Sequence, residues 1–223
     1  MITVHHLENS RSQRILWLLE ELGVEYRIVR YPRDKSTGLA PPELLAVHPL
    51  GKAPVITDGD VTVAESGAII EYLADRYDDG RLRPAEGTPE RLAYTYWLHY
   101  AEGTFMPLMI LSLIMRRIAS APMPFFVKPV ARGIVAKVRS GYLDPNLERN
   151  LAFMESSLAG SDWFCGDRMT AADIQMSFAV EAAAVRADLR DNRPRLADFL
   201  ERIHARPAYR AALEKGGPYQ LLG

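Results

Sequence analysis

The sequence predicts an α/β domain with the element order βαβ–ββα, followed by an all-helical domain. Strand-like and helix-like segments alternate over residues 1–80, and the strand signals stop after Thr88. Between the two regions, residues 81–88 combine glycine, proline and polar side chains, as linkers do. We therefore expect domains at residues 1–80 and 89–223, joined by a linker at 81–88.

The first half of the α/β domain has the pattern of a βαβ unit. Residues 2–7 and 26–31 read as strands, with alternating side chains. Between them, apolar residues recur at helical spacing over 15–22, and Gly23 follows as a C-cap. A short helix is expected next, at 42–47.

The second half predicts a hairpin and a helix. Two short apolar runs, 54–57 and 61–64, flank Asp58-Gly59-Asp60, and Asp-Gly between such runs is a hairpin signal. Residues 68–77 then have helical periodicity, with Ser66 as the expected N-cap.

Only helical patterns follow Thr88. Residues 90–118 predict one long helix, bent at Pro107. Thr170 and Asp173 are spaced as a capping box, a structural feature, at the start of a later helix. The further helices are expected at 132–142, 145–158, 171–189 and 194–205.

The composition bounds the function. Hydrophobic residues make up 48% and charged residues 25% of the 223 residues, which excludes wholesale disorder. A net charge of -1 argues against a nucleic-acid binder, which needs a basic excess. The longest apolar run, 105–115, is shorter than the roughly 20 residues of a membrane-spanning helix. With no secretory leader visible, we expect a cytoplasmic protein that is not bound to membranes.

Metal and thiol chemistry of the chain's own is not expected. A single cysteine, Cys165, excludes a disulfide framework, a CxxC redox centre and a zinc site with several thiolates. The pattern around it predicts a buried apolar residue rather than a nucleophile. His5 and His6 are adjacent on a predicted strand, so they point to opposite faces and should not share a metal.

Small polar residues stand between the first strand and the first helix, in Asn9-Ser10-Arg11-Ser12. Hydroxyl and amide side chains at this place can cap the helix and hydrogen-bond a ligand. A helix N-terminus also favours a negative charge nearby. Capping alone is the simpler interpretation of this segment.

Gly51-Lys52-Ala53-Pro54 leads into the hairpin. A proline after a glycine turn is a candidate for a cis peptide bond, with an ordinary trans turn as the alternative. The cis form would turn the backbone of Ala53 outward, where it could pair with an extended peptide.

Glu65-Ser66-Gly67 stands at the start of the next helix. Ser66 and the free N–H groups of the first turn form a carboxylate site, and Glu65 offers a negative charge to an ammonium. Together they could hold the α-amino-acid end of a ligand. The alternative is an N-cap with an acidic neighbour.

These features, in this order, resemble the glutathione transferase family, and the resemblance covers essentially the whole chain. It rests on His48-Pro49-Leu50-Gly51-Lys52-Ala53-Pro54-Val55-Ile56, on Glu65-Ser66-Gly67-Ala68-Ile69 and on the segment 163–174. The opening Glu8-Asn9-Ser10-Arg11-Ser12 is similar to the serine-type members, and residues 96–103 to a branch found in fungi and bacteria.

The resemblance implies a thioredoxin-like first domain, a homodimer with a detoxifying role, and glutathione as the cosubstrate without a metal. It makes Ser10 the catalytic residue, with Arg14 four residues on. It also implies a set of glutathione contacts: Ala53 and Pro54 for the cysteinyl backbone, Glu65 and Ser66 for the γ-glutamyl group, Lys52 for the glycine carboxylate, and Glu102 for the partner subunit's glutathione amine. Ala53 departs from the commoner valine or isoleucine, which leaves backbone pairing possible.

The implied chemistry is that of a thiolate. A free thiol, with a pKa of about 8.5, is mostly protonated at neutral pH, whereas the thiolate is the nucleophile. A hydrogen bond from the Ser10 hydroxyl to the sulfur would favour the anion, so Ser10 need not act as a base. Asn9 and Ser12 remain alternatives for this contact.

An electrophile should bind between the domains, against the long helix. We expect an apolar pocket lined by Tyr96, Tyr100, Phe105, Met106 and Met109, although these residues could equally be core or dimer contacts. Residues 103–143 carry six basic and no acidic side chains. They are either a basic lid that attracts anions or a solvated surface.

Three functions are compatible with the sequence. The first is transfer of glutathione to a small hydrophobic electrophile. The second uses the same thiolate to reduce peroxides or disulfides. The third is a non-catalytic interaction module of the same fold. The complete set of glutathione contacts favours an enzyme.

Overall fold

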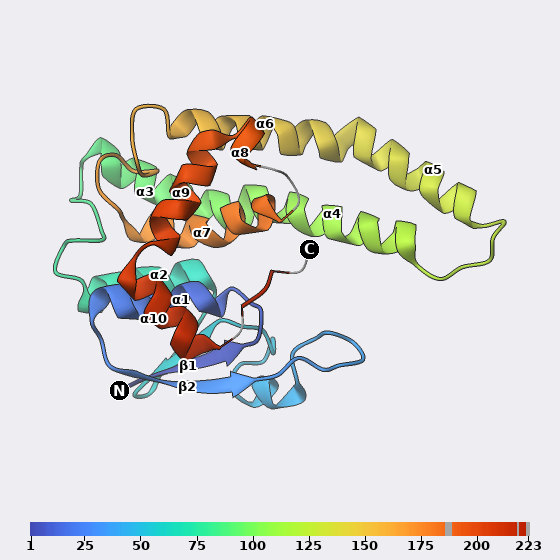
Figure 1. Cartoon of the computed structure of the whole chain (residues 1–223). Helices are drawn as coiled ribbons and strands as arrows, with labels where there is room; N and C mark the ends of the chain where they lie inside the picture. The colour runs from blue at the N-terminus through green and yellow to red at the C-terminus, as the bar shows by residue number, and fades with distance from the viewer. Residues whose placement is uncertain (186–188, 218, 222–223) are drawn as a thin grey trace.

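The computed structural model describes residues 1–185, 189–217 and 219–221, and it has the predicted architecture. A four-stranded sheet with two helices forms the first domain, and helices alone form the second (Figure 1). Both halves of the predicted βαβ–ββα order are present, so the first domain is thioredoxin-like.

The sheet is mixed, with the strand order β2-β1-β3-β4. Its strands are β1 (Ile2–Leu7), β2 (Tyr26–Tyr31), β3 (Val55–Asp58) and β4 (Val61–Ala64). β1 pairs in parallel with β2 and antiparallel with β3, and all six of its residues are buried. The turn that follows this central strand is therefore held firmly in place.

Two helices of the first domain follow the predicted signals. The helix α1 (Ser12–Leu22) ends at Gly23, which has the left-handed conformation (φ 67°) that a C-cap glycine supplies. A short 3₁₀ helix, η1 (Pro42–Ala46), precedes the hairpin, and α2 (Ser66–Tyr77) follows it. Ser66 is the first residue of α2 rather than its N-cap, because Glu65 occupies the cap position.

The predicted long helix is divided by a π turn. The helix α3 (Pro89–Tyr100) leads into η2 (Ala101–Phe105) and then into α4 (Met106–Ser120). A proline inside a helix clashes with the carbonyl four residues before it. For Pro107 that carbonyl belongs to Gly103, in the middle of η2. The wider π turn, which is five residues long, accommodates the proline.

The remaining helices complete the second domain. They are α5 (Lys128–Val138), the π turn η3 (Arg139–Leu143), α6 (Asp144–Ser157), α7 (Ala171–Ala184), α8 (Leu189–Asn192), α9 (Pro194–His204) and α10 (Pro207–Gly216). The helix predicted at 171–189 ends earlier, at Ala184, and positions 186–188 of that prediction lie outside the described residues. The predicted capping box is present, since the backbone N–H of Thr170 donates to Asp173 Oδ2 at 2.8 Å.

The helix α10 was not predicted. It packs against α1 in the first domain, next to which Figure 1 shows it. A Cβ atom on Gly216 would lie 2.7 Å from Gln13 Oε1 and 2.9 Å from Leu16 Cδ1, so this close approach requires glycine. The helix α10 thus packs closely against α1 and supports it.

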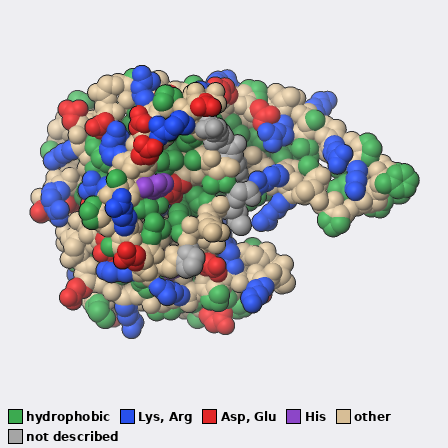
Figure 2. All heavy atoms as spheres, viewed as in Figure 1, with side chains coloured by type: hydrophobic (Ala, Val, Ile, Leu, Met, Phe, Trp, Pro, Cys, Tyr) green, Lys and Arg blue, Asp and Glu red, His purple; other side chains and the backbone are tan. Residues whose placement is uncertain are grey.

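A long arm projects from the body of the molecule. It consists of α4, α5 and the connecting residues 121–127 (Figure 1). Figure 2 shows hydrophobic side chains at its tip and Lys or Arg along its length. The tip residues Phe125 and Phe126 are 83% and 67% exposed.

The stretch Pro89–Ser120 is helical throughout and long and apolar enough, by length and composition, to cross a membrane. However, 44% of its most apolar window is buried inside the protein. One such helix is weak evidence for a membrane span, because a core helix of a globular protein passes the same test.

Candidate functional site

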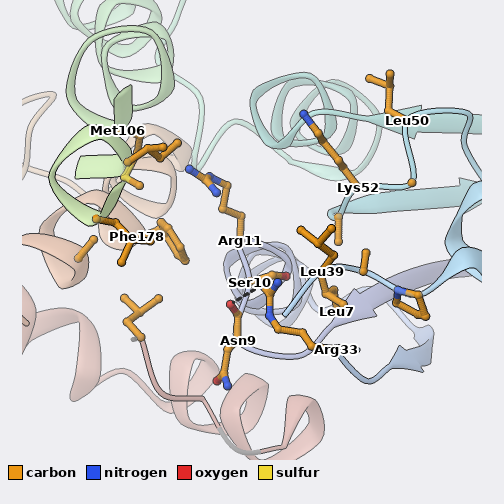
Figure 3. Close-up of a pocket in the computed structure, with 18 of the residues that line it drawn as sticks. Leu7, Asn9, Ser10, Arg11, Arg33, Leu39, Leu50, Lys52, Met106 and Phe178 are labelled. Atoms are coloured by element: carbon orange, nitrogen blue, oxygen red, sulfur yellow. Dashed lines mark hydrogen bonds between the residues drawn. The ribbon is translucent and has the colours of Figure 1, made fainter. Parts of the chain in front are cut away.

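A cavity of about 610 Å³ lies between the two domains (Figure 3). The first domain contributes the turn after β1, the loop around η1 and the segment before β3. The second domain contributes α4, α7 and the end of the chain. The described lining residues are Leu7, Asn9, Ser10, Arg11, Arg33, Leu39, Ala40, Pro41, Pro42, Leu45, Leu50, Gly51, Lys52, Ala53, Met106, Met109, Ile110, Leu113, Phe178, Ala182 and Leu221.

The turn between β1 and α1 presents Ser10 to this cavity. Ser10 Oγ lies 2.7 Å from Ser12 Oγ and accepts the backbone N–H of Ser12 at 3.2 Å. Asn9 also lines the cavity, in a left-handed conformation (φ 49°), and its Oδ1 accepts the N–H of Gln220 at 2.7 Å. Ser12 is fully buried and contacts His6 Nδ1 at 2.9 Å. Of the three candidates for a sulfur contact, the structure therefore turns Asn9 and Ser10, and not Ser12, to the cavity.

His6 lies behind the turn and is buried. Burial, with a smaller contribution from the charge of Arg30, lowers the pKa of His6 to about 4. The imidazole is therefore neutral at pH 7. It ends a hydrogen-bonded chain that runs from His6 through Ser12 to Ser10.

The segment before β3 forms the opposite side of the cavity. The Ala53–Pro54 peptide bond is cis, which decides between the two forms that the sequence left open. Lys52 and Ala53 line the cavity, whereas Pro54 is buried behind them. Gly51 has φ 56°, and a Cβ there would meet Leu45 Cδ2 at 2.7 Å, so glycine is required at this turn.

Glu65 and Ser66 lie at the start of α2, and neither is among the described residues that line the cavity. Ser66 is 2% exposed, and its Oγ accepts a hydrogen bond from Arg14 Nη2 at 2.8 Å. Because this oxygen is already an acceptor, its own hydroxyl proton is free to be donated to a carboxylate. Glu65 is exposed and makes no side-chain cap hydrogen bond.

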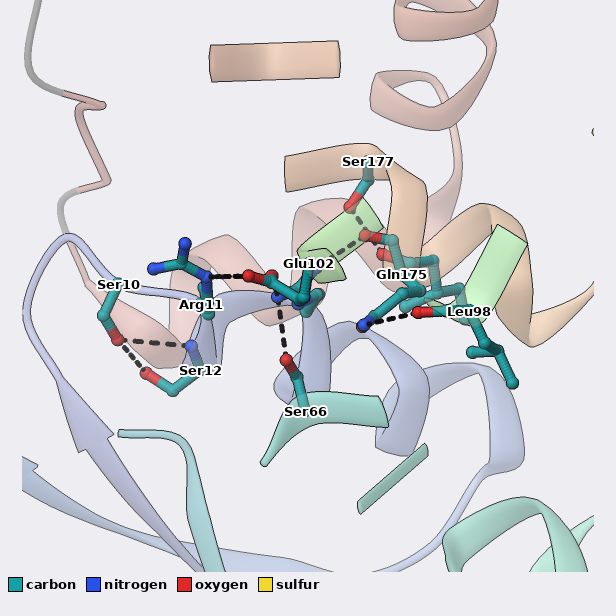
Figure 4. Close-up of polar contacts among 10 residues, drawn as sticks. Ser10, Arg11, Ser12, Ser66, Leu98, Glu102, Gln175 and Ser177 are labelled. Carbon is teal, nitrogen blue, oxygen red and sulfur yellow. Dashed lines mark hydrogen bonds and ion pairs between the residues drawn. The ribbon is translucent and has the colours of Figure 1, made fainter. Parts of the chain in front are cut away.

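A buried arginine, Arg14, connects the two domains, and Figure 4 shows the polar contacts around Glu102, Ser66 and Gln175. Arg14 donates to Gln175 O at 2.5 Å and to Ser66 Oγ, and it forms an ion pair with Glu102. Arg11 Nε donates to both carboxylate oxygens of Glu102, at 2.8 and 3.0 Å. Burial acts to raise the pKa of Glu102, but Arg14 and Arg11 outweigh it, and the pKa is lowered.

The five residues expected to bind an electrophile are not all brought together. Met106 and Met109 line the cavity. Phe105 is fully buried in the core, and Tyr100 is 5% exposed. Tyr96 is 47% exposed and stacks on Tyr100, with ring centroids 5.7 Å apart. The described lining of this cavity includes neither tyrosine nor Phe105.

Sequence reasoning missed Arg33 and Phe178. Arg33 joins the loop before η1 to the turn between β1 and α1. It donates to the carbonyl of Gly38 in the loop and to those of Glu8 and Asn9 in the turn, at 2.9–3.0 Å. Nothing local distinguishes it from a surface arginine. Phe178 has the signal of a core residue of α7.

Cys165 lies away from this site and is buried. Burial, helped by the nearby charge of Asp173, raises the pKa of its thiol to about 12, which makes it a poor nucleophile. Among residues 1–185, 189–217 and 219–221, no group of three or more His, Cys, Asp or Glu side chains could hold a metal ion. His5 and His6 face different partners, Tyr31 and Ser12.

Comparison with known proteins agrees with the resemblance. The family model of the glutathione S-transferase N-terminal domain matches residues 1–75, and that of the C-terminal domain matches residues 137–207. Glutathione S-transferase 3 of Schizosaccharomyces pombe is 37% identical over 217 residues, which cover 96% of this chain and 88% of that protein.

Two further comparisons extend over the same length. The crystal structure of a glutathione S-transferase from Actinobacillus pleuropneumoniae is 37% identical, with a TM-score of 0.82, and the match covers 97% of this chain and 93% of that one. The disulfide-bond oxidoreductase YfcG of Escherichia coli is 27% identical, covering 96% of this chain and 95% of that protein. With both domains matched in order and relatives this similar along nearly the whole chain, the protein belongs to the glutathione S-transferase family.

Proposed function

We propose that the protein binds glutathione in the cavity between its domains and transfers it, through sulfur, to a small hydrophobic electrophile. One observation carries this proposal. The same cavity joins polar groups of the first domain, Ser10, Lys52 and the backbone of Ala53, to an apolar wall of the second domain, formed by Met106 and Met109. A peptide thiol and an apolar acceptor can meet there.

Each part of glutathione has a partner in this arrangement. Ala53, with Pro54 behind it, would pair with the cysteinyl backbone, and Lys52 would bind the glycine carboxylate. The γ-glutamyl carboxylate would accept the free proton of Ser66 at the N-terminus of α2, where backbone N–H groups also favour an anion. Glu65 would bind the ammonium group.

The reaction needs an ionised sulfur. Ser10 precedes the first turn of α1, so its hydroxyl and the positive end of that helix both favour a thiolate. The thiol proton leaves to water, the sulfur lone pair forms a bond with the electrophilic carbon, and the leaving group departs with its bonding electrons. Ser10 acts as a hydrogen-bond donor throughout and keeps its own proton.

Replacing Ser10 tests the proposal. A charge-assisted hydrogen bond contributes about 1.5–3 kcal/mol, which corresponds to about one or two units of thiol pKa. For Ser10→Ala we expect kcat/KM with an aryl halide to fall about 10- to 100-fold at neutral pH, while the pH–rate profile shifts to higher pH. Ser10→Thr, which keeps the hydroxyl, should retain much of the rate. An unchanged rate in Ser10→Ala would remove Ser10 from this role.

A second activity is supported by a relative. The similar Escherichia coli protein is named a disulfide-bond oxidoreductase. On the same site, two glutathione molecules would be oxidised to their disulfide while a substrate disulfide is reduced to two thiols. Turnover of mixed disulfides and peroxides, measured beside aryl halides with the same preparation, separates the two activities. A protein that binds no glutathione in calorimetry would instead be a non-catalytic module.

We also propose that the protein is a homodimer in the cytoplasm. The exposed apolar side chains Ile114, Phe125, Phe126, Val130 and Ile134 along the arm support an assembly, because monomers rarely expose so many together. In such a dimer Glu102, held here by Arg11 and Arg14, could face the partner's glutathione amine. Sedimentation analysis measures the mass directly.

A further inference from the structure

The cavity carries positive charge only. Its described lining contains Arg11, Arg33 and Lys52, and it contains no Asp, Glu or His side chain. An apolar acceptor does not require this charge. Glutathione has two carboxylates, and the proposed function assigns them to Lys52 and to the start of α2. That assignment leaves the two arginines without a ligand.

The two arginines differ in how far their donors are occupied. Arg33 directs Nε, Nη1 and Nη2 to three backbone carbonyls, so its role is to hold the loop. Arg11 uses only Nε, which faces Glu102. Among the described residues, no hydrogen bond involves Nη1 or Nη2 of Arg11. Four N–H donors of this guanidinium therefore remain available to a ligand.

The charge of Arg11 is only partly neutralised. Glu102 is shared between Arg11 and the fully buried Arg14, so the three side chains together carry one net positive charge. Arg11 is partly shielded from solvent, with 28% of its side chain exposed. Charges in such places interact more strongly than charges in open water.

Arg11 also lies on the acceptor side of the cavity. Figure 3 shows its guanidinium between Met106 and Lys52, reaching from the turn toward the second domain. Its central carbon is 4.9 Å from the ring centroid of Phe178. From Met106 to Leu113, α4 extends the apolar wall over about 10 Å at 1.5 Å per residue. A cation beside an apolar wall fits an amphipathic molecule.

We propose that Arg11 selects acceptor substrates that carry an anionic group, such as a carboxylate on an aromatic electrophile. The inference rests on the proposed function and adds the class of electrophile. The apolar part of the acceptor lies against Met106, Met109 and Phe178. Its carboxylate lies on Nη1 and Nη2 of Arg11, in the two-pronged geometry that guanidinium groups favour.

A matched pair of electrophiles tests this. In 4-chloro-3-nitrobenzoate and its methyl ester, the thiolate displaces chloride from the same ring carbon. A C–S bond forms, the C–Cl bond breaks, and chloride leaves with the electron pair. Each kcat/KM is divided by the rate of the uncatalysed reaction with glutathione, which removes the difference in intrinsic reactivity. We expect the wild-type protein to favour the acid by about 10-fold or more, the usual effect of a charged hydrogen bond.

The variant Arg11→Gln should lose about 10- to 100-fold on the acid while changing little on the ester. Arg11→Lys, which keeps the charge but not the fork, should lie between Gln and Arg. As a matched control, Lys52→Gln should raise the KM for glutathione equally with both electrophiles and leave the acid-to-ester ratio unchanged.

The outcomes separate the two proposals. An acid-to-ester ratio near one in the wild-type protein overturns the role of Arg11, even if Arg11→Gln does not fold. An equal loss on both electrophiles in Arg11→Gln, with a raised thiol pKa in the pH–rate profile, also overturns it, because Arg11 would then act on the sulfur. If neither electrophile is accelerated and glutathione does not bind, the proposed function itself fails.

Discussion

At the scale of residues, the site depends on side chains that hold one another in place. Ser10 is presented to the cavity by Ser12, and Ser12 is held by His6. Arg14 donates a hydrogen bond to the hydroxyl oxygen of Ser66, so the hydroxyl proton of Ser66 is directed away from Arg14 and toward a ligand. The groups that touch glutathione in our proposal are therefore few, and buried polar partners determine their direction.

The buried His6 should make stability depend on pH. Its pKa is about 4 in the folded protein against an ordinary 6.5, so the unfolded chain takes up the proton first as the pH falls. The stabilisation is complete above pH 6.5 and is lost between pH 6.5 and 4, up to about 3 kcal/mol. Urea unfolding at several pH values measures this loss. The variant His6→Asn should show a flatter profile in this range, and a profile as steep as that of the wild type would contradict the assignment.

Some of this could be predicted from the sequence, and the reasons differ between residues. Ser10 and Lys52 lie in local segments whose residue types already suggest a ligand. The partnership of Arg11 with Glu102 could not be predicted, because 91 positions separate them and the π turn decides where Glu102 points. The expectation that Tyr96 and Tyr100 line the cavity rests on the suitability of aromatic side chains for an apolar pocket, but their rings pack against each other and against Phe153, which is distant in the sequence.

At the scale of elements, the residues at the ends of helices determine how well a helix can be predicted more than the residues in its interior do. The strands and α1 follow from alternation, helical spacing and Gly23. The helix α10 was missed because it begins directly after α9, and only Arg206-Pro207 marks the junction. Its strongest signal, Pro207 in the first turn, is also a common helix stop.

The contact between α10 and α1 predicts opposite effects of two glycine substitutions. In Gly216→Ala the new methyl group meets Gln13 and Leu16, and we expect a loss of about 1–3 kcal/mol from overpacking. A Cβ on Gly133, inside the exposed helix α5, would meet nothing within 4 Å, so Gly133→Ala should stabilise the protein by up to about 1 kcal/mol. Urea unfolding of both variants measures the difference. Equal effects would show that Gly216 is not closely packed.

At the scale of the whole molecule, the two domains share one hydrophobic core and one buried charge network. Arg14 contacts α2, η2 and α7 from its place on α1. Arg11, which pairs with the same Glu102, lines the cavity, so this network reaches the cavity wall. The two walls of the cavity should keep a fixed separation when a ligand enters.

Removing Arg14 should be costly for this reason. In Arg14→Met the buried oxygens of Ser66 and Gln175 lose a charged donor and Glu102 keeps only Arg11, so we expect a loss of about 3–5 kcal/mol. Arg139→Gln breaks an exposed ion pair with Asp144 and should cost less than about 1 kcal/mol. Chemical unfolding compares the two. Adding Glu102→Gln to Arg14→Met should recover part of the loss, and no recovery would contradict the coupling.

The π turn η2 sets the phase between α3 and α4. One additional residue in a helix rotates everything beyond it by about 100° relative to an uninterrupted spiral. In a regular helix, nine residues at about 100° each would place Met109 opposite Tyr100, whereas the extra residue of the π turn brings the two to within about 80°. If the same residues wound regularly through 101–105, Met106 and Met109 would turn by about 100° away from the sulfur nucleophile, so the wall that receives the acceptor owes its orientation to this one wide turn.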